Sequence, residues 1–237
     1  MKRKIFIMLI FAILLFGCGT SQSALAMDTG FSTQMMQPDE QKTFTTNIQL
    51  EKSEKAPVKK NGIVCFDVNE DGLIAAGTKD SSRKSISVYN SFGEYQYGYN
   101  FNCNQSFGVE WEGNNLIIYF VRSDVAALVD QSGTILELQK IENTIDNNSY
   151  WNHFVFATQR TVDNDKYIIK NDMGLFNIFA SSYSQLVVED AQGNQTILYD
   201  VNNAQMTRII IIFVASILVF VIAVSTIVHQ FLKSHKR

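Results

Sequence analysis

The chain has 237 residues, of which 20 are Lys or Arg and 23 are Asp or Glu, giving a formal net charge of −3. The charges are unevenly distributed, because residues 1–26 and 208–237 contain seven basic residues and no acid. The stretch between them holds 13 basic and 23 acidic residues, a net charge of −10. An acidic region argues against binding to nucleic acid and against docking on anionic lipid. Its simplest role is to keep an exported domain soluble.

Residues 1–26 have the pattern of a secretory signal peptide. A basic start precedes an apolar run over residues 5–16, and small residues follow. Ala24 and Ala26 fit a small-x-small cleavage site, whereas the tetrapeptide LFGC, which ends at Cys18, resembles a bacterial lipobox and implies lipidation there. Cleavage after Ala26, lipidation of Cys18 and an uncleaved anchor are three alternatives.

Residues 209–228 contain no charge, no proline and no glycine. As one continuous helix they would be about 30 Å long, which is enough to cross the hydrocarbon core of a bilayer. Arg208 precedes this run, and Lys233, Lys236 and Arg237 follow it. The positive-inside rule therefore places residues 229–237 in the cytoplasm of a single-pass cell-membrane protein. Residues 202–208 then form a juxtamembrane segment, and the globular part lies on the opposite side of the membrane.

The region before this helix divides into two parts. Residues 27–60 are polar and lack periodicity, which predicts a largely disordered linker with a possible short strand at residues 46–50. Residues 61–201 are rich in Val, Ile, Tyr and Phe, with Gly, Asn and Asp at short intervals. This composition is typical of many short strands, so we expect an all-β extracytoplasmic domain.

A repeated hairpin pattern runs through residues 61–201. The segments SVYNSFGEY, ALVDQSGTI and VVEDAQGNQ align on Gly93, Gly133 and Gly193. Three residues before each glycine stands an Asn or Asp, whose side chain would bond the turn backbone while the glycine takes a positive φ. Another candidate hairpin precedes each of these, so the expected unit is four antiparallel strands, three times over. The positions expected to be buried are Ile74, Val88, Leu116, Ile118, Leu128, Ile135, Val188 and Ile197.

A four-stranded unit that recurs at this spacing resembles a β-propeller blade. The resemblance covers residues 63–201 and implies a partial or small propeller-like array. A closed propeller usually has at least four blades, so three units do not establish that the array closes into a ring. An antiparallel β-sandwich has the same rhythm of strands and turns, and is the alternative fold.

The segment DVNEDG, residues 67–72, matches the opening of a calcium-binding loop. Asp67, Asn69 and Asp71 would supply oxygen ligands, and Gly72 would allow the sharp turn. The twelfth position is Thr78 rather than the bidentate Glu of an EF-hand. A hairpin turn explains the same residues, and we expect neither a metal nor a cofactor.

Candidate catalytic residues are sparse. His153 is the single histidine of residues 61–201, so any His-dependent nucleophile system would have to use it, although a packed or loop position is the simpler interpretation. A hydrolase that uses two carboxylates is another possibility. Acids are plentiful, but the spacing singles out none of Asp67, Asp71, Glu110, Glu112 and Asp124. No catalytic residue is assigned.

Cys65 and Cys103 are the two cysteines after the signal peptide, in a compartment that permits disulfides. If they ended the first and last strands of one flat four-stranded unit, three strand spacings would separate them, which is too far for a bridge. A disulfide remains possible if Cys103 lies beyond the last strand. Two buried, inert thiols are the alternative.

Tyr95, Tyr97 and Tyr99 alternate along one predicted strand, followed by Phe101. Side chains two residues apart share a face of a strand, so the tyrosines form a possible binding face for sugars or a protein. A half-buried sheet face is the simpler interpretation.

The leading functional hypothesis is a membrane-tethered interaction or sensor domain that binds a protein or an envelope ligand. A cell-envelope hydrolase and a structural accessory subunit of a membrane complex are the alternatives. A partial array leaves an open sheet edge, which a partner protein, a second copy or residues 46–50 could cover. Ser216 and Ala223 lie on one face of the predicted membrane helix and permit close approach of another helix.

Overall fold

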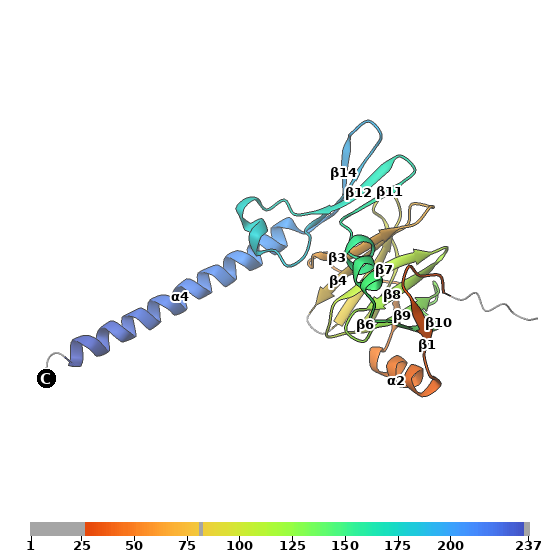
Figure 1. The fold of residues 1–237 in the computed structure, drawn as a ribbon. Coiled ribbons are helices and arrows are strands. Elements are labelled where there is room, and N and C mark those ends of the chain that lie inside the picture. The colour runs from red at the N-terminus through yellow and green to blue at the C-terminus, as the bar shows by residue number, and fades with distance from the viewer. Residues whose placement is uncertain (1–26, 81–82, 235–237) are drawn as a thin grey trace, which may run out of the picture.

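The computed structural model describes residues 27–80 and 83–234, and it consists mainly of three antiparallel sheets followed by one long helix (Figure 1). The first sheet has the order β2-β6-β5-β4-β3, the second β1-β10-β9-β8-β7 and the third β11-β12-β13-β14. The strands of the first sheet are β2 (Glu51–Ser53), β3 (Ile63–Val68), β4 (Ile74–Asp80), β5 (Arg83–Tyr89) and β6 (Tyr95–Asn102). Those of the second are β1 (Thr33–Met35), β7 (Phe107–Glu112), β8 (Asn115–Phe120), β9 (Val125–Val129) and β10 (Ile135–Ile141). Those of the third are β11 (Gln159–Val162), β12 (Asp165–Lys170), β13 (Gln185–Glu189) and β14 (Gln195–Asp200). The helices are α2 (Pro38–Ile48), α3 (Ile145–Tyr150), the π-helix η1 (Trp151–Val155), the 3₁₀-helix η2 (Gly174–Phe179) and α4 (Asn202–Ser234).

The predicted repeat of four antiparallel strands is confirmed. Strands β3 to β6, β7 to β10 and β11 to β14 each pair in sequence order within one sheet. There are three sheets in the described residues rather than the two of a sandwich, and they do not close into a propeller ring.

The predicted turns are present at equivalent positions of the three sheets. Gly93, Gly133 and Gly193 have φ values of 78°, 88° and 82°. Each turn is held by the side chain three residues earlier, whose Oδ1 accepts two backbone N–H groups at 2.8 to 3.0 Å; these residues are Asn90, Asp130 and Asp190. A local side-chain bond and a left-handed glycine therefore fix each hairpin independently of the rest of the chain.

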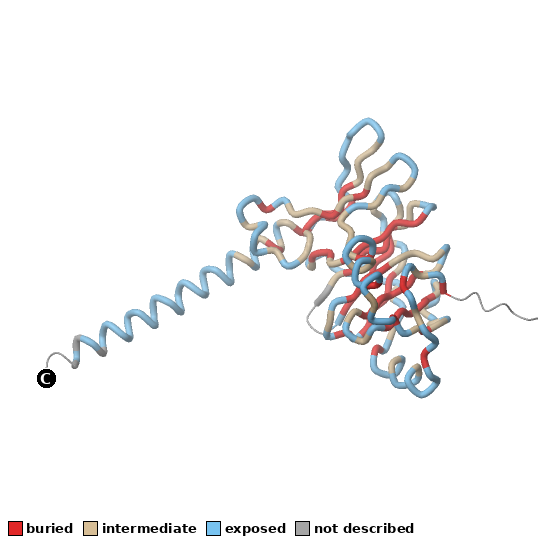
Figure 2. Tube along the Cα trace, viewed as in Figure 1, coloured by how far each residue is buried: buried red, intermediate tan, exposed pale blue. Residues whose placement is uncertain are grey.

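Three apolar clusters define the layers of the domain. One cluster lies between the first and second sheets and includes Phe101 and Ile118, which are fully buried. A second lies between the first and third sheets and includes Phe66 and Leu186. The first sheet is thus buried on both faces and forms the middle layer. Figure 2 shows the buried residues in red, gathered inside the domain and absent from the length of α4 that leaves it.

The third cluster covers the opposite face of the second sheet. Tyr119 and Leu128 of that sheet pack against Met27, Phe31 and the residues of α3 and η1. This face would contact a neighbouring sheet in a closed propeller. Because the N-terminal segment and a helix occupy it instead, the second and third sheets do not complete a ring through it.

Residues 27–60 are not a disordered linker. They contain β1, α2 and β2, and β1 and β2 extend the second and first sheets by pairing with β10 and β6. The short strand predicted at residues 46–50 is wrong, because α2 continues to Ile48, whose buried side chain packs into the cluster between the first and second sheets. The strand follows at β2.

Most of the expected buried positions are confirmed. Ile74, Val88, Leu116, Ile118 and Leu128 are at most 5% exposed, and Ile135 and Val188 are half-buried. Ile197 was expected to be buried and is 53% exposed. A register shift between β13 and β14 pairs Leu186 with Tyr199 but Val187 with Ile197. Leu198 is therefore the extra residue of a β-bulge, and the alternation assumed from the sequence fails at this point.

The C-terminal helix α4 is long and apolar enough to cross a membrane over Asn202–His229, and residues 210–229 of this span are exposed. The continuous helix predicted for residues 209–228 is confirmed, and the helix starts earlier, so residues 202–208 are helical as well. The predicted signal peptide and Cys18 lie outside the described residues.

Candidate functional site

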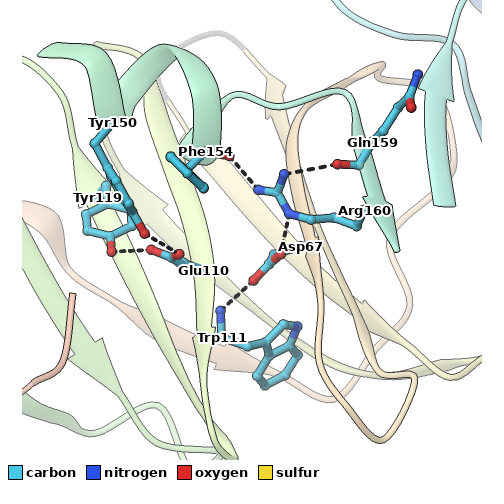
Figure 3. A network of polar contacts seen from close by, with 8 residues as sticks. All are labelled: Asp67, Glu110, Trp111, Tyr119, Tyr150, Phe154, Gln159 and Arg160. Atoms are coloured by element: carbon cyan, nitrogen blue, oxygen red, sulfur yellow. Dashed lines mark hydrogen bonds and ion pairs between the residues drawn. The ribbon is translucent and has the colours of Figure 1, made fainter. Parts of the chain in front are cut away.

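Polar side chains gather where β3, β7 and β11, one edge strand from each sheet, come together. β3 lies against both β7 and β11, so residues far apart in sequence become neighbours. Asp67 comes from β3, Glu110 and Trp111 from β7, and Arg160 from β11, as Figure 3 shows. One polar network thereby links all three sheets.

Asp67 and Arg160 form the central ion pair of this network. Nε of Arg160 lies 2.6 Å from Oδ1 of Asp67, and the two side chains are 18% and 10% exposed. The other carboxylate oxygen of Asp67 accepts the Trp111 backbone N–H at 2.7 Å. Arg160 also donates to the carbonyl oxygen of Phe154 at 2.6 Å, which fixes the end of η1 (Figure 3).

Glu110 holds the helical cover of the second sheet in place. Its two carboxylate oxygens accept hydrogen bonds from the hydroxyl groups of Tyr119 and Tyr150, with oxygen–oxygen distances of 2.5 and 2.6 Å. Burial and the nearby Glu110 raise the pKa of both tyrosines, so they remain protonated donors. Tyr150 belongs to α3, and its bond to Glu110 joins this helix to the sheet.

The chemistry of this network is structural. Asp67 is occupied by a guanidinium and a backbone amide, and Glu110 by two hydroxyls. Asp67 is 7% exposed, and Glu110 is half-buried. Within the described residues, no group of three or more His, Cys, Asp and Glu side chains could hold a metal ion.

The three residues of the calcium motif act separately. Asp67 faces Arg160, whereas Oδ1 of Asn69 accepts the Leu73 N–H at 2.8 Å and stabilises the turn between β3 and β4. Gly72 has a φ of 75° in that turn, and Asp71 is exposed. The motif thus forms a fourth turn of the same type as those at Gly93, Gly133 and Gly193.

Cys65 and Cys103 are both free and buried. Cys65 is on β3, and Cys103 follows β6, with two strands of the first sheet between them. Burial raises the pKa of both thiols, which suits packing residues rather than nucleophiles. The described structure thus has the two separate thiols of the alternative interpretation.

Tyr95, Tyr97 and Tyr99 do not share one open face. A register shift between Val88 and Tyr89 places Tyr95 against the cluster between the first and third sheets, and Tyr97 against the cluster on the other side. Tyr99 is 1% exposed and donates its hydroxyl to the Asp130 carbonyl at 2.8 Å. The row is mainly a packing surface.

His153 lies on η1, where it is exposed. Its Nδ1 is 2.9 Å from the carbonyl oxygen of Ser149, one helical turn earlier. It is not part of the polar network of Figure 3.

A groove of about 980 Å³ lies near the first residues of β3 and β7, beside the start of α4. The polar network lies toward the other end of the same two strands. Connections from all three sheets line it. Its charged residues are the buried Lys84 and the exposed Arg208, and no acid among the described residues lines it. Its aromatic walls are Phe107, Phe156 and Tyr183, and its uncharged polar residues are Asn61, Asn104, Gln105, Ser106, Ser181 and Ser182.

Two groove residues have a defined polar environment. Arg208 donates to Oδ1 of Asn61 at 3.1 Å, so the start of α4 is bonded to the chain entering β3. Oε1 of Gln105 is buried and has no hydrogen-bond partner among the described residues. The groove therefore offers the exposed guanidinium of Arg208 and the buried acceptor of Gln105, whereas Lys84 is buried. No pattern in the sequence predicts this groove, because its residues are spread from position 61 to 208 and follow no motif.

Comparison of the chain with protein-family models, curated proteins and solved structures produced no match.

Proposed function

We propose that this protein is a membrane-tethered interaction domain that binds an acidic, extended segment of a partner protein in the groove beside α4. In this proposal α4 spans the cell membrane, the sheets lie outside the cytoplasm and residues 229–237 lie inside. The basic residues after the apolar run, Lys233, Lys236 and Arg237, support this orientation.

The observation that supports the proposal is the charge of the groove. Residues 27–207 carry 23 acids and 13 bases, yet Lys84 and Arg208 are the charged residues that line the groove. The exposed Arg208 in this recess of an acidic domain attracts a carboxylate. The unpartnered Oε1 of Gln105 suits a donor such as a peptide N–H. An acidic peptide supplies both groups.

The location of the groove supports a partner in or beside the membrane. Arg208 directly precedes the apolar run of α4, so the groove opens close to the expected bilayer surface. A soluble ligand would have no need of this position, whereas the exposed loop of another membrane protein would reach it directly.

Site-specific photo-crosslinking in cells tests the proposal. A photoreactive amino acid at Ser181, which is exposed and lines the groove, is compared with the same amino acid at Gln192, which is exposed in the turn between β13 and β14. We expect a defined crosslinked product from position 181, with the partner peptide identified by mass spectrometry as acidic, and none from position 192.

A charge reversal makes this test specific. Arg208→Glu should abolish the crosslink from position 181, whereas Arg122→Glu, at an exposed position that does not line the groove, should leave it intact. Equal crosslinking from positions 181 and 192, or a product insensitive to Arg208→Glu, would exclude the groove as the binding site.

A further inference from the structure

The loop between β12 and β13 exposes an unusual amount of apolar surface. It contains η2, in which Leu175, Ile178 and Phe179 are 90%, 81% and 58% exposed. Residues 173–184 contain no charged side chain. Single exposed apolar residues are normal on a protein surface, but three within five positions of an uncharged loop indicate a contact.

The base of this loop is bonded to the start of α4. Oδ1 of Asn202 accepts the Asp172 N–H at 3.4 Å and the hydroxyl proton of Ser184, and Gln205 donates to the Ser182 hydroxyl at 3.1 Å. η2 also packs against α4. In Figure 1 the loop extends along the first turns of α4, on the side of the domain from which the helix leaves.

These contacts fix where the loop lies along the axis of α4, relative to the apolar run that begins at residue 209. Gln205 is four residues before residue 209, which corresponds to about 6 Å along a helix. Met173 is 5% exposed and secures the loop to the domain, so Leu175 and Ile178 point away from the core rather than into it. The exposed apolar side chains are therefore held beside the end of the membrane-spanning segment.

We propose that Leu175, Ile178 and Phe179 insert into the interfacial layer of the phospholipid bilayer beside α4, giving the domain a second attachment to the membrane. This inference rests on the proposed tethering by α4. The contact is apolar, because residues 173–184 carry no charge and the domain as a whole is acidic. A neutral phosphatidylcholine bilayer is sufficient for it. Two attachments fix the tilt of the domain, and thereby the height of the groove that Ser181, Ser182 and Arg208 line.

Depth-dependent fluorescence quenching tests this attachment. The full chain is reconstituted into phosphatidylcholine vesicles with and without bromine on the acyl chains, as the variants Phe179→Trp and Met35→Trp. Met35 is 83% exposed on β1, which lies on the side of the domain away from α4 (Figure 1). We expect brominated lipid to reduce the emission of Trp at position 179 and to leave Trp at position 35 unchanged, after subtraction of the wild-type signal of Trp111 and Trp151.

A third variant tests whether α4 spans the bilayer, independently of whether the loop inserts into it. Phe213→Trp reports on the interior of α4 and should be quenched if the helix spans the bilayer. Quenching at 213 without quenching at 179 would overturn the loop insertion while retaining the tether. No quenching at 213 would overturn both. Replacing Leu175 and Ile178 with Ser in the Phe179→Trp background should restore emission, and retained quenching would contradict insertion through these side chains.

Discussion

The second and third sheets flank the first, and their outer faces differ. The outer face of the second sheet is covered by Phe31, Trp151 and neighbouring residues of the N-terminal segment and η1. The outer face of the third sheet carries a polar chain in which Lys170 bonds Gln195 and Gln195 bonds Glu189. One flank is a sealed core layer, whereas the other is only partly covered, with Val187 buried and its pairing partner Ile197 53% exposed. The difference indicates that the first two sheets are the stable body of the domain, whereas the third links this body to α4.

The largest expected loss of stability lies between the first two sheets. Phe101 is fully buried and packs edge-on against Phe107 and Phe120, with ring centroids 5.2 and 5.5 Å apart. Phe101→Ala should lower the free energy of unfolding by about 3–5 kcal/mol, because it removes apolar contacts and leaves a cavity. Chemical denaturation of the full chain in detergent measures this. Phe92→Ala, at a position 82% exposed, is the control and should have little effect.

Phe31→Ala should have the next largest effect, because Phe31 covers the second sheet. The centroid of its ring lies 5.1 Å from that of Tyr119, 4.7 Å from that of Tyr150 and 4.6 Å from that of Trp151. We expect a loss of about 3 kcal/mol and increased binding of a hydrophobic dye. Unchanged stability would restore the interpretation of this segment as a linker.

Asp67→Ala should weaken the attachment of the third sheet. The substitution leaves the Arg160 guanidinium and the Trp111 N–H without their common acceptor, at a cost of about 2 kcal/mol. Hydrogen exchange should become faster in β12 and β13 and remain slow in β8 and β9. A double-mutant cycle with Arg160→Met should show coupling, and additive effects would mean that the ion pair does not join the sheets.

The sequence predicted those features that local chemistry determines. An Asn or Asp three residues before a glycine specifies its own turn, so Asn90, Asp130 and Asp190 could be interpreted without knowledge of the fold. The strands of the repeated four-stranded unit and the apolar helix followed from composition and periodicity in the same way.

Features that depend on distant partners could not be predicted. Residues 27–60 look like a linker because their few apolar side chains, such as Phe31 and Ile48, are buried only against sheets formed by later residues. Spacing groups Asp67 with Asn69, yet the ion-pair partner of Asp67 is Arg160, 93 positions away. The groove combines connections from every sheet, and no local pattern in the sequence reports such a combination.

The turns provide a smaller comparison between the flanking sheets, through their pH dependence. Hydrogen bonds lower the pKa of Asp130, mainly the one from the Ser132 hydroxyl. Hydrogen bonds also lower the pKa of Asp190, mainly the one from the Asn194 side chain. A carboxyl whose folded pKa is lowered contributes stability above its unfolded pKa, about 3.9, and this is lost as pH falls through the folded pKa. NMR titration should give both pKa values below that of a free Asp. Asp130→Asn, which imitates Asn90, should keep the turn and remove its pH dependence.

The smallest effect is expected at the open flank. Ile197 is 53% exposed on β14, where the bulge at Leu198 turns it away from the cluster that holds Tyr199. Ile197→Thr should change the free energy of unfolding by no more than about 0.5 kcal/mol, because little apolar surface is lost and the hydroxyl stays in water. Ile118→Thr is the matched control in the second sheet, where the side chain is fully buried, and it should cost at least about 2 kcal/mol. If the two substitutions were equally costly, the outer face of the third sheet would have to be covered in solution. Repeating the measurement across a range of protein concentrations would then show whether a second copy covers it, because only that cover depends on concentration.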